Sequence, residues 1–156
     1  QYRKWHHTQW ISRGIYMNKQ SSWEECIQNN TSLTVSPDNA KANSLIEIAK
    51  GRTLFLSKSH REESSINYIF EGYYASVLEI LHALLLRKGI KVLNHLCLGY
   101  YLRDVLKRTE DYRKFDDIRT KRNALVYYGN KLESNVATEA IETCKKLIDQ
   151  LLEMQQ

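Results

Sequence analysis

The chain has 156 residues, enough for one domain that buries a sizeable core without a metal or a disulfide to hold it together. Hydrophobic residues make up 42% of it and charged residues 26%, the proportions of an ordinary soluble protein. The formal net charge of +5 permits an RNA or DNA partner without requiring one. The longest apolar stretch, residues 80–86, is too short to span a bilayer, so no membrane association is expected.

The cysteines and the N-terminal region indicate the compartment. Cys26, Cys97 and Cys144 are an odd number without a CxxC pair, which favours free thiols in a reducing environment. The first twenty residues lack the continuous apolar core of a signal peptide. We therefore expect a cytoplasmic protein.

Residues 1–35 show no clear hydrophobic period and are expected to be weakly ordered, apart from a short helix over 23–28. The first long helix is predicted to begin at Ser36-Pro37-Asp38 and to reach about Ser57. Ser is a good N-cap, Pro suits the first helical position, and Asp favours the positive end of the helix dipole.

The second helix, residues 63–88, has apolar side chains at steps of three and four in a wide stripe. Such a stripe predicts the central helix of the fold, covered on several sides. Three more helices are predicted over residues 94–109, 112–128 and 134–154. Short links favour antiparallel neighbours, so residues 36–156 are expected to form an all-α, up-and-down bundle of four to five helices without a sheet.

The most informative stretch lies late in the fourth of these long helices. Asn123 and Tyr127 are one helical turn apart, Arg119 lies one turn before Asn123, and Arg122 borders the apolar side. A guanidinium beside an apolar stripe needs partners. Those partners are either a ligand or, in the simpler interpretation, a neighbouring helix or carboxylate.

Two of the predicted helices carry motifs that resemble those of the HEPN family (higher eukaryotes and prokaryotes nucleotide-binding). Members carry Arg-x(4–6)-His on a late helix, often with Asn directly after the Arg, and Arg122-Asn123 stand at that place here. An earlier helix of the family reads roughly Tyr-Tyr-Ala, apolar residues, then Lys-Gly-Ile, and this chain has Tyr73-Tyr74-Ala75 and Gly89-Ile90. The resemblance covers about residues 37–154.

The resemblance implies a homodimer of helical bundles whose motif helices line a shared cleft. In active members the Arg and the His cleave RNA without a metal, and many members are toxins paired with a minimal nucleotidyltransferase. This chain departs from the pattern, because Tyr127 stands five residues after Arg122, where His is expected, and no His follows His95. Tyr, with a pKa near ~10, is a far weaker base at neutral pH than His, with a pKa near ~6.5.

The sequence therefore predicts a protein that binds RNA or a nucleotide in a dimer cleft through Arg119, Arg122, Asn123 and Tyr127. Its ribonuclease activity is expected to be weak or lost; if it were active, Arg122, Asn123 and Tyr127 would be the catalytic residues. The alternatives are a non-enzymatic dimerisation or assembly module, or an active metal-independent ribonuclease toxin paired with a minimal nucleotidyltransferase.

Other polar residues have simpler explanations. His82 is expected to be a satisfied core or rim residue, and Glu71 and Glu79 to be solvated. His95 and Cys97 supply only two of the three or four ligands that a zinc site requires. No metal site and no cofactor are expected.

Overall fold

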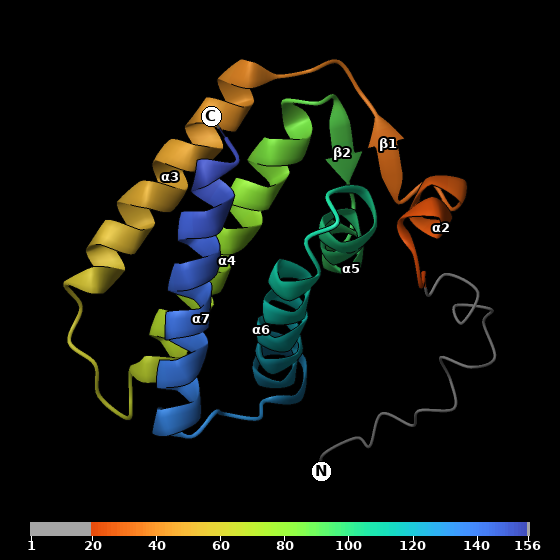
Figure 1. Ribbon diagram of the computed structural model, residues 1–156. Coiled ribbons are helices and arrows are strands. Elements are labelled where there is room, and N and C mark those ends of the chain that lie inside the picture. The colour runs from red at the N-terminus through yellow and green to blue at the C-terminus, as the bar shows by residue number, and fades with distance from the viewer. Residues whose placement is uncertain (1–19, 156) are drawn as a thin grey trace, which may run out of the picture.

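The computed structural model describes residues 20–155 (Figure 1). In chain order its elements are α2 (Trp23–Gln28), β1 (Ser32–Thr34), α3 (Asn39–Ser57), α4 (Ile66–Leu86), β2 (Ile90–Val92), α5 (His95–Tyr100), the π-helical η2 (Tyr101–Val105), α6 (Thr109–Tyr128) and α7 (Ser134–Glu153). Figure 1 shows the long helices α3 and α6 running in one direction and α4 and α7 in the other. The prediction of an all-α, up-and-down bundle is confirmed.

The central helix is α4, as predicted, although it spans Ile66–Leu86 rather than 63–88. α3 and α7 both pack along it, and α5 and α6 contact it as well. Large side chains all around α4 are buried, among them Phe70, Tyr73, Leu81 and Leu85. Among residues 20–155, α4 is the one helix whose length and composition would let it cross a membrane, and 67% of the window that meets this criterion is buried inside the fold.

The start of α3 lies slightly later than predicted. Asp38 rather than Ser36 is the N-cap, and its Oδ1 accepts a hydrogen bond from the backbone N–H of Lys41 at 2.9 Å. The N–H of Asp38 itself donates to the carbonyl of Leu86 at 3.1 Å. The same residue therefore begins α3 and attaches it to the end of α4.

The single helix predicted over 94–109 is instead two segments of different geometry. Asn94 caps α5 by accepting a hydrogen bond from the backbone N–H of Cys97 at 2.8 Å. From Tyr101 the backbone widens into a π-helix, and the chain then turns at Lys107, whose φ is 56°. α6 consequently begins at Thr109, earlier than the predicted 112.

Residues 20–35 hold defined structure where weak order was expected; residues 1–19 lie outside the described part. α2 occupies the predicted short helix, and Ser22 caps it. β1 and β2 pair antiparallel, so the expectation of no sheet was wrong for this two-stranded ribbon. Gly89, with a φ of +73°, turns the chain out of α4, and a Cβ there would lie only 2.6 Å from the carbonyl oxygen of Val35. The two-stranded ribbon thus depends on Gly89, which follows the end of α4.

Cys26 and Cys97 form a disulfide, so the expectation of free thiols is wrong for these two residues. Both are fully buried, and the bond joins α2 to the first half of α5. Their sequence separation of 71 residues hides the pair from any search for short cysteine spacings. Cys144 is a free thiol buried in α7, and burial raises its pKa.

Candidate functional site

The charged side chains of α6 mostly neutralise one another. Its basic and acidic residues form pairs three or four positions apart, namely Arg113–Glu110, Arg119–Asp116 and Lys121–Asp117. Such pairs on a solvated helix contribute little to stability, about 0.3–0.5 kcal/mol each. Because these pairs engage Arg113, Arg119 and Lys121, most of the positive charge of α6 is compensated within the helix.

Arg122 is the exception on this helix. It stands four residues after Ile118 and seven after Phe115, both fully buried, so the helical repeat brings it to the edge of the core. Its Cζ lies 5.5 Å from the centroid of the Tyr74 ring and 5.5 Å from that of the Tyr127 ring. Its Nη1 donates a long hydrogen bond of 3.4 Å to the Tyr127 hydroxyl. The guanidinium is therefore held between two aromatic rings.

No carboxylate among residues 20–155 lies within ion-pair distance of Arg122. The other arginines in that range each have a carboxylate or amide oxygen as partner; they are Arg52, Arg61, Arg87, Arg103, Arg108, Arg113 and Arg119. A guanidinium has five N–H donors, and a single long bond to a tyrosine leaves most of them unused within the described fold. Arg122 is thus the arginine best placed to receive an external anion.

His95 reaches the same place from the start of α5. Its Nδ1 and the Tyr74 hydroxyl are hydrogen-bonded at 3.1 Å. Tyr74 also stacks on Phe115 of α6, with ring centroids 6.3 Å apart and an interplanar angle of 12°. One buried tyrosine of the central helix therefore contacts His95 through its hydroxyl and Arg122 through its ring. The His95 Nε2 forms no hydrogen bond to any residue between 20 and 155.

The position of these groups shifts their proton affinities. Burial, the positive charge of Arg122, the nearby His82 and the charge of Arg119 lower the pKa of His95 to about 4. Burial also raises the pKa of Tyr74, against the opposing effect of Arg122 and Arg119. At neutral pH the imidazole is therefore uncharged and the phenol protonated. Since Arg119 is paired with Asp116, the uncompensated charge in this cluster is the guanidinium of Arg122.

The structure brings together three of the four residues predicted for the site. Arg122 and Tyr127 are in contact, and Arg119 is close enough to lower the pKa of His95. Asn123 is half-buried, and its side chain forms no hydrogen bond within residues 20–155, so no hydrogen bond joins it to the cluster. The side chain of Tyr127 is 68% exposed, which leaves one face of the site open to solvent.

Sequence reasoning did not identify Tyr74 and His95 as site residues. In the sequence Tyr74 stands out only within the Tyr73-Tyr74-Ala75 resemblance, and His95 only as one of two potential zinc ligands. Asn94, a strong N-cap, marks where a helix starts just before His95. Nothing in a single sequence indicates, however, that this helix start lies beside Arg122, because the turn through β2 determines that placement.

The remaining candidates have structural roles. Glu79 bonds the guanidinium of Arg52, with Nη2 at 2.9 Å, and so ties α4 to α3 rather than being solvated as expected. His82 lines a separate cavity of about 430 Å³ between α3, α4 and β2, and burial lowers its pKa. No group of three or more His, Cys, Asp or Glu side chains that could hold a metal ion occurs among residues 20–155.

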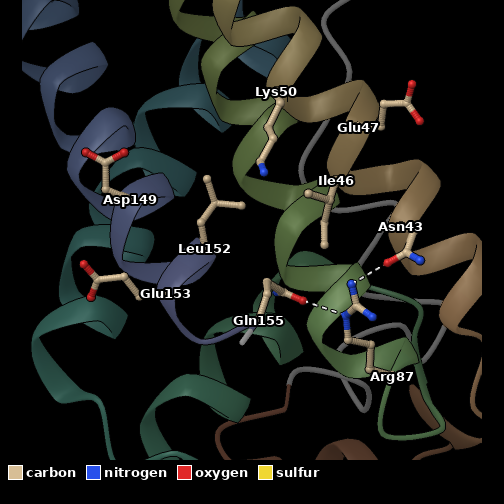
Figure 2. A pocket seen from close by; sticks show the side chains of 9 residues that line it. All are labelled: Asn43, Ile46, Glu47, Lys50, Arg87, Asp149, Leu152, Glu153 and Gln155. Carbon is tan, nitrogen blue, oxygen red and sulfur yellow. Dashed lines mark hydrogen bonds between the residues drawn. The ribbon is translucent and has the colours of Figure 1, made fainter.

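A hollow of about 850 Å³ lies away from this cluster, between α3, α7 and the end of α4 (Figure 2). Figure 2 shows Arg87 inside it, donating to Gln155 at 3.0 Å and to Asn43 at 2.7 Å. Acids outnumber bases in its lining, which includes Glu47, Asp149 and Glu153 as well as Lys50 and Arg87. Its size therefore does not make it the better site for a nucleic acid, and none of the predicted site residues lines it.

Comparison with known proteins adds no relative, so any proposal of function rests on the residues described above. No protein-family model matches the chain, and searches of curated proteins and of solved structures find no match either.

Proposed function

We propose that this chain is a HEPN-like helical protein that binds single-stranded RNA or a nucleotide at the Arg122 cluster and cleaves RNA poorly or not at all. The observation that carries the proposal is Arg122 itself, a guanidinium at the edge of the core without a carboxylate or amide partner among residues 20–155. A planar guanidinium matches two oxygens of a phosphate group, and phosphate contacts provide most of the affinity for RNA backbones.

Exposed aromatic rings next to Arg122 support a single-stranded ligand over a duplex. Tyr127 and Tyr128 end α6 with 68% and 76% of their surface exposed. Unpaired bases stack on such rings, with a contribution of about 1–3 kcal/mol per base. A phosphate at Arg122 and a base on Tyr127 are then neighbouring parts of one nucleotide.

Poor cleavage follows from the proton affinities in the cluster. Metal-free cleavage needs a base that accepts the proton of the 2′-hydroxyl and an acid that protonates the leaving oxygen. Tyr127 replaces the motif histidine, and phenols hold their proton at neutral pH. His95, with a pKa lowered to about 4, is a weak base. The cluster thus has donors for binding and lacks an efficient base.

A second function, dimerisation through α6, has its own observation. Val126, Tyr127 and Tyr128 form an exposed apolar end of that helix, with 43%, 68% and 76% of their surface accessible. Consecutive exposed side chains of this kind are common at interfaces. A homodimer with α6 at the contact would place two Arg122 clusters near each other. Sedimentation showing only monomer at high micromolar concentration would argue against this second function.

The test of RNA binding compares two arginines of the same helix. Arg113→Gln removes the same charge as Arg122→Gln, but Arg113 is already paired with Glu110. Fluorescence anisotropy with a labelled oligouridylate should show Arg122→Gln weakening binding by roughly fivefold or more and reducing the salt slope by about one unit, with Arg113→Gln close to the parent. Equal effects of the two substitutions would mean that binding is non-specific attraction to a basic protein. Efficient metal-independent cleavage that Arg122→Gln abolishes would instead indicate an active ribonuclease.

A further inference from the structure

Two polar groups that the described fold leaves with unused hydrogen-bonding capacity both contact Tyr74. Arg122 stands over the ring with its Cζ at 5.5 Å from the centroid, and His95 bonds the hydroxyl at 3.1 Å. Within residues 20–155 the guanidinium has no acidic partner, and the His95 Nε2 has no hydrogen bond. The two groups come from different helices, α6 and α5, and both contact the same core residue, Tyr74. They are close enough for the charge of Arg122 to lower the pKa of His95.

The pair suits a tetrahedral oxyanion. The guanidinium fork can bond two oxygens of a phosphoryl group, and an imidazole N–H can bond a third. We infer that His95 and Arg122 bind one phosphoryl group between them and that His95 takes up a proton when this group binds. The inference rests on the proposed function, in which the phosphoryl group belongs to an RNA backbone.

The charged and titratable groups around His95 explain the coupling. Tyr74 and His82 face it from α4, and Arg119 and Arg122 face it from α6. No carboxylate among residues 20–155 forms an ion pair with His95. In the free protein the two arginines oppose a positive imidazole, which contributes to its lowered pKa. A bound phosphate offsets those charges and accepts a hydrogen bond from the imidazolium, so it favours the protonated form.

Linkage gives the sign of the pH dependence. A ligand that raises the proton affinity of His95 is itself bound more tightly by the protonated protein, to the same extent. Affinity should therefore rise as pH falls from the pKa of His95 in the complex towards about 4, its pKa in the free protein. Above the pKa of the complex, affinity should be independent of His95 protonation.

An oligouridylate without terminal phosphates is the appropriate probe, because neither uracil nor a phosphodiester titrates between about pH 5 and pH 8. At constant ionic strength, the parent protein should bind it about three- to tenfold more tightly near pH 5.5 than near pH 7.5. His95→Gln should have a flat pH profile, because the variant has no imidazole to take up a proton. His60→Gln is the matched control, since the His60 side chain is 83% exposed and lies in the loop before α4, and it should keep the parental slope.

The outcomes separate this inference from the proposed function. Arg122-dependent binding with a flat parental profile, or an equal slope in His95→Gln, overturns the proton uptake and leaves RNA binding intact. Absence of binding overturns both. If His95→Gln fails to fold, an NMR titration of the His95 ring protons in the parent protein gives the answer: saturation with the oligouridylate should raise the His95 pKa by about two units, and an unchanged value contradicts the inference.

Discussion

The Tyr74 hydroxyl and the His95 Nδ1 lie 3.1 Å apart, and their hydrogen bond joins the central helix α4 to the first residue of α5. Because Tyr74 is buried to 99% of its surface, this bond is shielded from water. The ring of the same tyrosine supports Arg122 from α6. The geometry of the candidate site therefore depends on one aromatic residue of the core.

Replacing Tyr74 by Phe tests the contribution of this hydrogen bond. The substitution keeps the ring under Arg122 and removes the hydroxyl, so the free energy of unfolding should fall by about 1 kcal/mol while RNA affinity changes little. Tyr68→Phe is the control, because the Tyr68 side chain is mostly exposed. Chemical denaturation measures both variants. Equal stability of Tyr74→Phe and the parent would mean that the bond contributes nothing.

The lowered pKa of His95 predicts a dependence of stability on pH. The folded protein binds a proton at His95 only near pH 4, whereas an unfolded histidine binds one near its ordinary value of 6.5. The unfolded chain thus binds more protons between these values, so stability is full above about pH 6.5 and falls as the pH decreases. His82, whose pKa is also lowered, acts in the same direction.

Because His95 is partly solvated, its share of this loss should be on the order of 1 kcal/mol rather than the full effect of the shift. Urea unfolding at several values between about pH 7 and pH 5 would measure it, a range in which most carboxylates stay ionised. His95→Gln should reduce the slope of stability against pH. An unchanged slope in this variant would show that the imidazole is not desolvated as described.

The cysteines give a prediction that counting thiols can check. Protein purified without reductant should react with no thiol reagent while folded, because all three cysteines are fully buried. After denaturation one thiol per chain, that of Cys144, should react. Three reactive thiols would show that Cys26 and Cys97 are reduced and would favour the original expectation of a reducing compartment. If the disulfide is present, reducing it should lower stability by about 2–4 kcal/mol.

Tyr127→His restores the spacing of the motif in a single step. His at this position would stand next to Arg122 on an open face of the site, where its pKa can remain near the ordinary value of about 6.5. We expect the variant to cleave single-stranded RNA faster than the parent, without added metal, by roughly tenfold or more. Arg122→Gln in the same background should abolish the gain. If neither protein acts on RNA, the assembly module becomes the better interpretation of α6.

The long helices were predictable because each depends on local signals. The apolar stripe of α4 and the left-handed Gly129 after α6 are visible in the sequence and fix these elements within a few residues. The ribbon and the Cys26–Cys97 bond were not predictable, because each joins segments that are distant in sequence. Three-residue strands are also too short to show a period.

The same distinction applies to the candidate site. Arg122 and Tyr127 share one helix and were assigned to one site from the sequence. The helical spacing, however, indicated Asn123 as the neighbour of Tyr127, whereas in the structure Arg122 contacts it. Tyr74 and His95 come from α4 and α5, and their approach to Arg122 is a property of the folded bundle. The pairing of Arg119 with Asp116 was likewise visible as an i to i+3 spacing, but the sequence alone did not show that Arg122 would lack such a partner.

Mapping the binding surface by NMR tests the central claim most directly. On titration with an oligouridylate, backbone amide and His ring signals should change most in the second half of α6, around Arg122 and Tyr127, and at the start of α5, around His95. The signals of residues that line the hollow of Figure 2, around Asn43 and Asp149, should be unaffected. Changes concentrated in that hollow, or no changes at saturating RNA, would contradict the assignment of RNA binding to the Arg122 cluster.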